Sequence, residues 1–173
     1  HFPEIELDLI LSDAVTDLAR EGVDLALRLG RPPEAGSWVA SKLFDTHYRV
    51  VASPGYLEKF GRPLRPSDLS QHDGLFFCLP AFRDGWHFRR HRDSAMEEAL
   101  PRSGLTISNA LALRRAVLAN MGVALLADWT IADDISSGAL VDLFPDHDVS
   151  AGQFDSAAWI IYLSKAYMPT RLR

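Results

Sequence analysis

The chain has 173 residues, of which 47% are hydrophobic and 24% are charged, a composition typical of a folded domain and not of a disordered segment. Its formal net charge of −5 argues against DNA binding by this chain itself, because contacts with phosphates need a basic surface. No apolar run is long enough to span a membrane and the first residues do not resemble a signal peptide, so we expect no membrane partner.

The first predicted elements are a strand, a helix and a second strand. In residues 5–11 apolar side chains alternate with acidic ones, which predicts a strand. Ser12 or Asp13 can cap the helix that follows, and Gly22 can end it. Asp24 to Leu29 is mostly apolar, as expected for a strand that is covered on both faces. This order predicts a βαβ unit, and therefore a parallel sheet at the start of the chain.

The remaining elements continue the alternation of strands and helices. Further strands are predicted at residues 39–44, 48–52, 74–79, 105–108, 123–126, 140–143 and 157–163. A helix starts at Ser108 or Asn109, and shorter ones are predicted near 67–69 and at 131–137. Such alternation predicts an α/β fold, and the second strand–helix–strand group at 104–126 suggests a second lobe.

Cys78 is the only cysteine of the chain, so it excludes an internal disulfide and fits a reducing compartment. It lies in the apolar run LFFCL, where a cysteine most simply acts as a small buried hydrophobic side chain. We therefore expect Cys78 to belong to a core.

Two blocks carry a resemblance to a known family. The first is GVDLALRLGRPPEAGSWVASKLFDTHYRVVASPGYL, from Gly22 to Leu57, in which a strand ends in a tight turn at Leu29-Gly30. The second is GLTISNALALRRAVLANMGVALLADW, from Gly104 to Trp129. Both closely resemble the effector-binding domain of LysR-type transcriptional regulators.

This resemblance implies a two-lobe fold of the type 2 periplasmic-binding-protein class, with a hinge that the chain crosses twice. Lobe one would contain residues 1–50 and 146–173, and lobe two residues 51–145. The resemblance also implies that the chain starts and ends inside the family's domain, so that lobe one is incomplete and the DNA-reading winged helix-turn-helix is absent. Asn120 stands where the family often has glycine, and asparagine tolerates the left-handed geometry of that turn.

A ligand of such a fold is expected beyond the carboxyl ends of strands. The first candidate segment is Arg28, Leu29, Gly30 and Arg31, where the glycine permits close backbone approach and an arginine can pair with a carboxylate. The alternative is that Gly30 only makes the turn and the arginines are solvated or paired with aspartates.

Two further strand ends are candidates for the same site. Ser108 and Asn109 stand at the start of a helix, where exposed amides and the helix dipole favour an anion, although simple capping explains them too. Leu79 and Pro80 can supply apolar walls, or can be a plain strand end. Trp86 can close such a pocket with its ring or belong to the core.

Other constellations do not support a catalytic, metal or cofactor site. His87 and His91 would share a helix face, but no third zinc ligand is evident. The acidic groups at Asp133-Asp134 and at 146–148 are more typical of a solvated surface than of acid–base chemistry. Serine-hydrolase, dinucleotide-binding and P-loop motifs are missing. We therefore expect no metal, no cofactor and no enzymatic activity.

The resemblance implies an effector-sensing and oligomerisation module of a bacterial, cytoplasmic regulator. A small organic molecule, with a carboxylate as one candidate, would bind in the cleft between the lobes and shift the population of a homodimer or tetramer. DNA would be contacted only through the absent N-terminal domain. A free-standing periplasmic-type solute-binding protein is the main alternative, and an enzyme built on the same two lobes is a second one.

Overall fold

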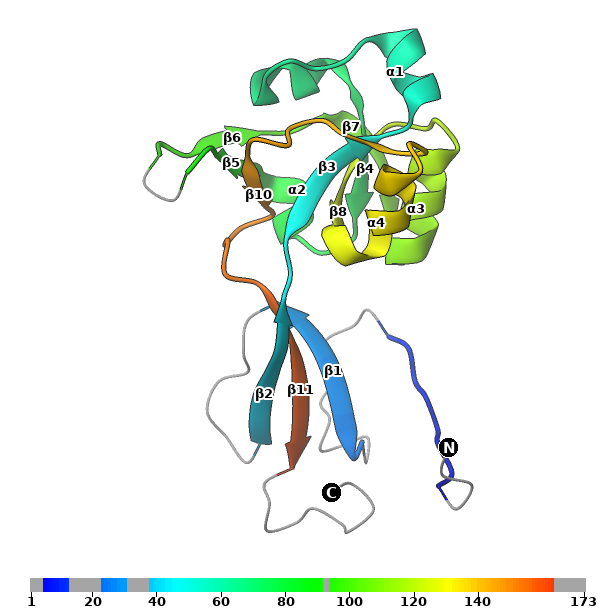
Figure 1. Cartoon of the computed structure of the whole chain (residues 1–173), viewed down its shortest axis with the longest axis vertical. Helices are drawn as coiled ribbons and strands as arrows, with labels where there is room; N and C mark the ends of the chain where they lie inside the picture. The colour runs from blue at the N-terminus through cyan, green and yellow to red at the C-terminus, as the bar shows by residue number, and fades with distance from the viewer. Residues whose placement is uncertain (1–4, 13–22, 31–37, 92–93, 164–173) are drawn as a thin grey trace. The chain divides into compact units, whose positions relative to one another are not determined.

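The computed structural model describes residues 5–12, 23–30, 38–91 and 94–163 (Figure 1). The chain divides into two compact units. The smaller unit contains residues 1–45 and 157–173, and the larger unit contains residues 46–156. Each unit is described by itself below.

The described part of the smaller unit is a three-stranded antiparallel sheet. Its strands are β1 (Leu25–Gly30), β2 (Trp38–Asp45) and β11 (Ala157–Leu163), in the order β1-β11-β2. The central strand β11 pairs with β2 along its whole length and with β1 from Ala157 to Tyr162, and its residue Ile161 is buried. The apolar side chains of β1, such as Leu27, are exposed on one face.

The parallel βαβ unit predicted for the start of the chain is wrong for the described residues. Residues 5–12 form no strand, and β1 pairs with β11 in antiparallel orientation. The alternating pattern needs a partner strand and a covered face to become a strand, whereas Leu7 and Leu11 are 79% and 87% exposed. The face of β1 that was expected to be covered is also exposed among the described residues. The helix predicted between Ser12 or Asp13 and Gly22 falls outside the described residues.

The larger unit contains a mixed sheet of eight strands among its described residues. The strand order is β6-β5-β10-β3-β8-β4-β7, and β9 pairs with β3 beside this path. The strands are β3 (Tyr48–Ala52), β4 (Asp73–Phe77), β5 (Trp86–Arg89), β6 (Glu97–Ala99), β7 (Arg102–Ile107), β8 (Val123–Ala127), β9 (Val141–Asp142) and β10 (Asp148–Ser150). β4 is parallel to β7 and β8, and the other pairs are antiparallel.

Helices lie beside this sheet in the larger unit (Figure 1). They are α1 (Pro54–Phe60), the 3-10 helix η1 (Pro66–Gln71), α2 (Ala81–Asp84), α3 (Ala110–Leu118) and α4 (Asp128–Ser136). The structure therefore starts the last helix at Asp128, three residues before its predicted start. The helix predicted to start at Ser108 or Asn109 is present as α3, and Asn109 is its N-cap.

The core of the larger unit consists of two apolar clusters, one on each face of the sheet. Along β8, Val123 and Leu125 belong to one cluster, whereas Ala124 and Leu126 belong to the other. This alternation follows from the two-residue period of a strand and leaves all five residues of β8 buried. Trp86 is buried in the first cluster, which confirms the core interpretation of its ring.

The left-handed turn expected at Asn120 is present. Asn120 has a φ of +62° and follows α3, and its side-chain oxygen accepts a hydrogen bond of 2.7 Å from Ser53 Oγ. The side chain of Asn120 also occupies the space that a Cβ at Gly55 would need. The turn thus connects the end of α3 to the start of α1.

The chain passes between the units after Asp45 and after Ser156, whereas the expected boundaries were 50/51 and 145/146. The difference arises because β3 and β10 pair with each other and with central strands of the larger sheet. At these crossings, Thr46 N donates a hydrogen bond of 2.8 Å to Ser156 O.

His72 is expected to make stability depend on pH. Burial, with a contribution from the Arg102 charge, lowers the pKa of His72 below its ordinary value, so the folded chain keeps this ring neutral. The unfolded chain takes up a proton below about pH 6.5, and therefore stability is lost as the pH falls through that value. Urea unfolding between pH 8 and pH 5 should show a smaller loss for His72→Gln than for wild type. The exposed His91→Gln is the control, and an equal loss in all three proteins would contradict this assignment.

Candidate functional site

The candidate site of the larger unit is the edge where its parallel strands end. Because β4, β7 and β8 are parallel, their carboxyl ends lie at one edge, and β3 starts there since Tyr48 pairs with Ala127. We call this the carboxyl edge. It comprises residues 46–48, 78–80, 107–109, 127–129 and 156. Ligands of open α/β sheets bind at such edges.

The two predicted segments of the larger unit meet at this edge. Cys78 N donates a hydrogen bond of 3.2 Å to Ile107 O, so Leu79-Pro80 and Ser108-Asn109 continue from neighbouring strand ends. All four of these residues are exposed. Cys78 itself is half-buried, and not fully buried as expected, because it lies at the margin of the core where β4 has just ended.

The role of Asn109 as a cap is visible in the structure. Its Oδ1 accepts a hydrogen bond of 2.9 Å from Ala112 N in the first turn of α3. This contact satisfies one of the amides that a helix start leaves unpaired, and it leaves the side-chain NH2 group exposed. The neighbouring Ser108 is exposed and lies outside this cap.

A cluster of aromatic rings includes Phe82 of α2, the helix that directly follows Leu79 and Pro80. The ring of Phe82 in α2 meets those of Tyr48 and Phe77 edge-on, each at 5.5 Å between centroids. No motif or local pattern in the sequence distinguishes Tyr48 or Phe82 as a site residue. A pairing between the start of β3 and the end of β8 is a long-range contact that no local pattern indicates.

The predicted residues of the smaller unit lie at the end of β1. Gly30 has a φ of +109°, which favours glycine, and its carbonyl accepts a hydrogen bond of 3.0 Å from Trp159 Nε1. Arg28 is half-buried and pairs in register with Trp159, while Leu29 is exposed. Arg31 falls outside the described residues. The turn role of Gly30 is thus present, and a ligand role for Arg28, Leu29 or Gly30 stays a prediction.

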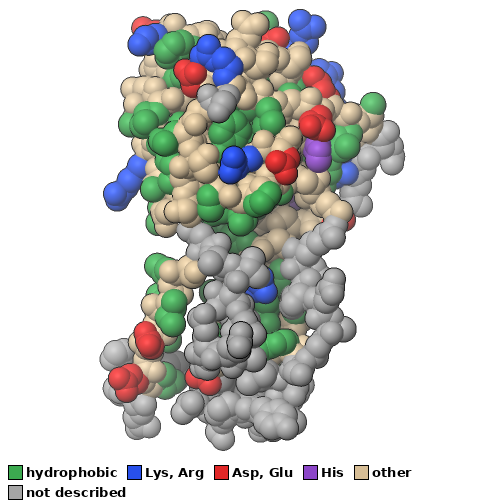
Figure 2. All heavy atoms as spheres, turned by 180° about the vertical axis from the view of Figure 1, so that it is seen from behind, with side chains coloured by type: hydrophobic (Ala, Val, Ile, Leu, Met, Phe, Trp, Pro, Cys, Tyr) green, Lys and Arg blue, Asp and Glu red, His purple; other side chains and the backbone are tan. Residues whose placement is uncertain are grey.

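Basic and acidic side chains are interspersed on the face of the larger unit seen in Figure 2. No broad basic patch covers the described part of that face. Phosphate backbones are bound by clustered lysine and arginine side chains, and the described part of this face shows no such cluster.

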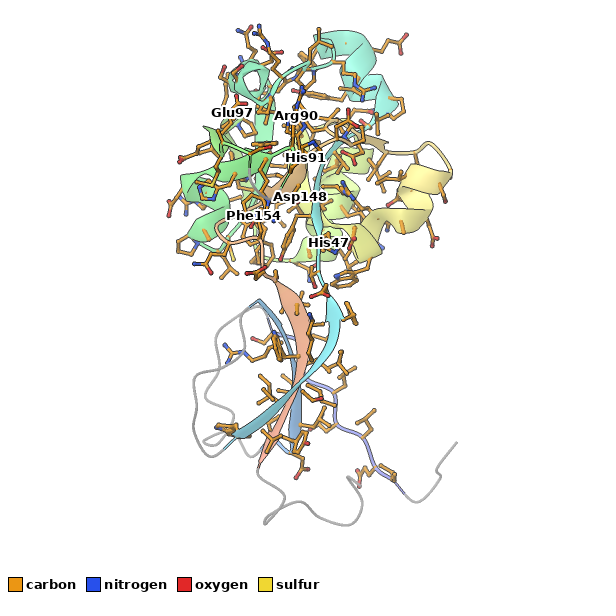
Figure 3. The ribbon with its side chains drawn as sticks, turned by 60° about the vertical axis from the view of Figure 1, so that its left-hand side comes forward. His47, Arg90, His91, Glu97, Asp148 and Phe154 are labelled. Atoms are coloured by element: carbon orange, nitrogen blue, oxygen red, sulfur yellow. The ribbon has the colours of Figure 1, made fainter. Side chains whose placement is uncertain are left out.

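His87 and His91, the two histidines considered as zinc ligands, do not belong to a group of metal-ligating side chains among the described residues. His87 lies in β5, and its Nδ1 is 2.8 Å from Gly152 O. His91 follows β5 next to Arg90, and His47 directly precedes β3 (Figure 3). No group of three metal-ligating side chains occurs among the residues that the structure describes.

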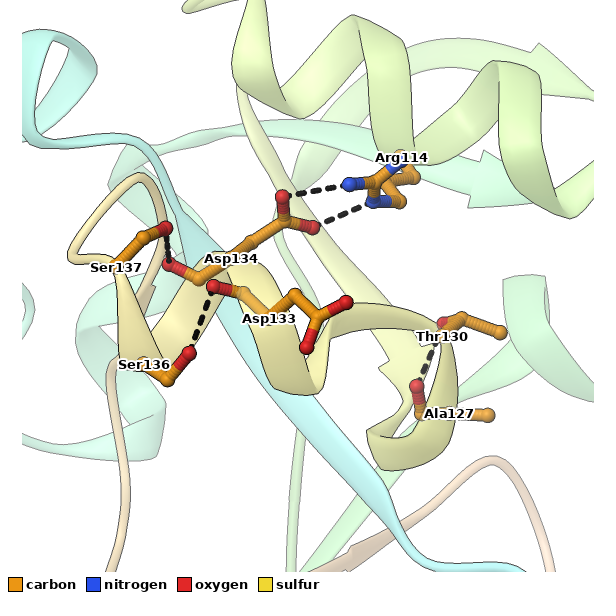
Figure 4. Close-up of polar contacts among 7 residues, drawn as sticks. All are labelled: Arg114, Ala127, Thr130, Asp133, Asp134, Ser136 and Ser137. Atoms are coloured by element: carbon orange, nitrogen blue, oxygen red, sulfur yellow. Dashed lines mark hydrogen bonds and ion pairs between the residues drawn. The ribbon is translucent and has the colours of Figure 1, made fainter.

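Asp134, the second residue of the acidic pair Asp133-Asp134, joins two helices. Asp134 is buried, contrary to the expectation of a solvated surface, because its two oxygens accept hydrogen bonds of 2.5 and 2.6 Å from Arg114 (Figure 4). Asp133 remains exposed. The ion pair between Arg114 and Asp134 connects α3 to α4. It occupies both carboxylate oxygens of Asp134, so this carboxylate is not free for acid–base chemistry.

Breaking this ion pair is expected to destabilise the larger unit. Arg114→Met should lower the free energy of unfolding by about 2–3 kcal/mol, because it leaves a buried carboxylate without its partner. Arg115→Met removes an exposed charge from the same helix and should change stability by less than about 0.5 kcal/mol. Urea unfolding at pH 7 measures both, and equal changes would contradict a stabilising role for the pair.

The cap at Asn109 makes a second, smaller contribution. Asn109→Ala is expected to lower the free energy of unfolding by about 1 kcal/mol, because the amide of Ala112 loses its acceptor. Ser108→Ala is the matched control and should change stability by less than about 0.5 kcal/mol. A similar loss in both variants, measured by urea unfolding, would argue against capping.

Comparison with known proteins identifies the family. The whole chain, residues 1–173, matches the model of the LysR substrate binding domain. The chain belongs to this family. It is 34% identical over 172 residues to the HTH-type transcriptional regulator PtxR of Pseudomonas aeruginosa, covering 99% of this chain and 53% of that protein. It is 32% identical over 145 residues to the regulator CrgA of Neisseria meningitidis, covering 84% of this chain and 47% of that one.

Solved structures agree with the family at the level of the fold. The full-length structure of the Vibrio cholerae virulence activator AphB matches with a TM-score of 0.81 and 24% identity, over 99% of this chain and 56% of that one. The regulatory domain of CrgA from Neisseria meningitidis matches with a TM-score of 0.72 and 28% identity, over 90% of this chain and 72% of that one. The predicted α/β fold of the type 2 periplasmic-binding-protein class is thereby confirmed.

The LysR substrate binding domain is thus a part of longer proteins among these relatives. The chain spans about half the length of the curated relatives that it matches. These relatives are transcriptional regulators and not enzymes. No helix in the described ranges combines the length and the apolar character that crossing a membrane requires.

Proposed function

We propose that this chain is the effector-sensing and oligomerisation domain of a bacterial, cytoplasmic LysR-type regulator. The observation that carries the proposal is the match of the whole chain to the LysR substrate binding domain. The curated relatives are named as HTH-type regulators and are about twice as long as the chain. In such a protein, DNA is read by a separate helix-turn-helix domain, and this domain, with its net charge of −5, senses a small organic molecule.

The effector site includes the carboxyl edge of the larger unit. Leu79 and Pro80 supply an apolar wall there, and Ser108 and Asn109 supply polar groups at the start of α3. Small-molecule sites combine largely apolar walls with a few convergent polar groups, as these four residues do. The exposed NH2 group of Asn109 is available to a ligand because only its oxygen is used by the cap.

Arg28, Leu29, Gly30 and Arg31 of lobe one are the other residues that we propose for ligand binding, and an arginine there selects a carboxylate. The two compact units correspond to the two lobes, joined by a hinge that the chain crosses twice. An effector that prefers one arrangement of the lobes shifts a population of dimers or tetramers, and the attached DNA-reading domains change their spacing. The protein has no catalytic role in this scheme.

A ligand screen tests the sensing role. Small carboxylates, aromatic acids, amino acids and quinones are added to the purified protein, and its unfolding midpoint is measured. Binding to the folded state raises the unfolding midpoint by mass action. A ligand concentration one hundred times the dissociation constant adds about 2.7 kcal/mol to the free energy of unfolding. A carboxylate hit should weaken at least tenfold in Arg28→Ala, and any hit at the carboxyl edge should weaken in Asn109→Ala.

Arg115→Met, which changes an exposed residue outside the proposed site, serves as the folded reference protein for these measurements. A hit that keeps its affinity in both Arg28→Ala and Asn109→Ala would place the effector elsewhere. Absence of any hit would argue against sensing. A free-standing solute-binding protein is the alternative, and it predicts ligand binding without any effect of the ligand on binding of the full-length protein to promoter DNA.

A further inference from the structure

The two crossings of the chain carry a pair of hydroxyl groups at the boundary of the larger unit. Thr46 is its first residue and Ser156 its last, and the hydrogen bond of 2.8 Å from Thr46 N to Ser156 O holds them side by side. Thr46 is 2% exposed and Ser156 is 9% exposed. Thr46 Oγ1 has no hydrogen-bond partner among the described residues, and Ser156 Oγ has none apart from its approach to the Tyr48 hydroxyl.

Such an arrangement is unusual for a folded domain. Most buried side-chain polar atoms have a hydrogen-bond partner, because leaving one unpaired sacrifices its interaction with water. Two neighbouring exceptions, one on each crossing, therefore point to a function that the fold by itself does not require. Both belong to the carboxyl edge, where the ends of β4, β7 and β8 also lie.

Tyr48 adds a third hydroxyl to this pair. Burial raises the pKa of Tyr48, and the nearby Ser156 hydroxyl offsets part of that rise, so the phenol remains a neutral group that can donate and accept. The Tyr48 ring packs edge-on against Phe82. Phe82 lies in α2, the helix that follows Leu79 and Pro80. We call Thr46, Tyr48 and Ser156 the hydroxyl cluster.

The charges around the hydroxyl cluster are acidic. Asp45 directly precedes Thr46 and Asp155 directly precedes Ser156. Asp128 lies at the same edge, since its amide donates a hydrogen bond of 2.9 Å to His47 O. Asp45 is paired with Lys42, Asp155 is exposed, and Asp128 is half-buried with its Oδ1 accepting a hydrogen bond of 2.7 Å from Trp129 N. Like charges repel at this range, so the surroundings disfavour an anion and favour a neutral or cationic group.

We propose that the hydroxyl cluster of Thr46, Tyr48 and Ser156 binds an uncharged or positively charged hydrogen-bonding group of a small molecule, such as an amide, a hydroxyl or an ammonium, in preference to a carboxylate. This proposal rests on the sensing function proposed above and names the part of the effector that this edge recognises. Hydroxyls can donate and accept, so the acidic surroundings decide which ligand groups are favoured.

Three matched probes that share a hydroxymethyl group test this selectivity. They are glycolamide, which is neutral, ethanolamine, which is cationic at pH 7, and glycolate, which is anionic. Dissociation constants are measured by ligand-observed NMR with the wild-type chain and with the double variant Thr46→Val/Ser156→Ala. We expect glycolamide and ethanolamine to bind wild type at least tenfold more tightly than glycolate does, and this preference to be lost in the double variant.

The stability of the ligand-free variant supplies an independent readout. Replacing an unpaired buried hydroxyl by an apolar group of the same shape should leave the unfolding midpoint unchanged or raise it slightly. Tyr48→Phe, which keeps the ring against Phe82, is the second variant and should also weaken glycolamide binding. A lower midpoint with unchanged probe binding would show that the hydroxyls hold only a structural water, and this result would overturn the proposal.

Three other results would overturn it as well. They are equal probe affinities in wild type and all variants, a preference for glycolate, and no binding of any probe to wild type. An effector found in the screen above that binds the double variant as tightly as wild type leaves the sensing function standing and rejects the hydroxyl cluster. Probe binding as expected, without any effector in that screen, supports the cluster and counts against sensing.

Discussion

The burial of one sheet on both faces is the constraint on which the larger unit depends. β3 and β8 lie at its centre, and their side chains alternate between the two apolar clusters. A strand buried on both faces cannot slip by one residue without exchanging its whole set of contacts, so the register is strongly specified. This register brings the start of β3 and the ends of β4, β7 and β8 to one edge.

The polar groups of the unit are arranged around that sheet. Arg114 and Asp134 connect α3 to α4 outside one apolar cluster, and the pair is stable there because both carboxylate oxygens are used. At the carboxyl edge the situation is different, since Thr46 and Ser156 are buried with unused hydrogen-bonding capacity. Satisfied groups hold the unit together, whereas unsatisfied ones at a strand edge suit recognition of a ligand.

Much of this architecture was predictable from local patterns. The strand at 123–126, the helix capped by Asn109 and the left-handed turn at Asn120 all follow from signals within a few residues. The first predicted strand failed because residues 5–12 have the alternating pattern but no paired neighbour among the described residues. The prediction of a solvated surface at Asp133-Asp134 was wrong at Asp134 for a similar reason. The partner of Asp134 is Arg114, which lies on another helix twenty residues earlier.

The sequence by itself determined the family, the α/β class and the position of Leu79-Pro80 and Ser108-Asn109 just after two strands, because these depend on periodicity, capping and short blocks of residues. Only the tertiary structure decided that β1 is antiparallel to β11, that the boundaries of the larger unit are Thr46 and Ser156, and that Tyr48 joins them at one edge. The physical reason is that strand pairing and burial depend on contacts between residues about a hundred positions apart, such as Thr46 and Ser156, and no local pattern records them.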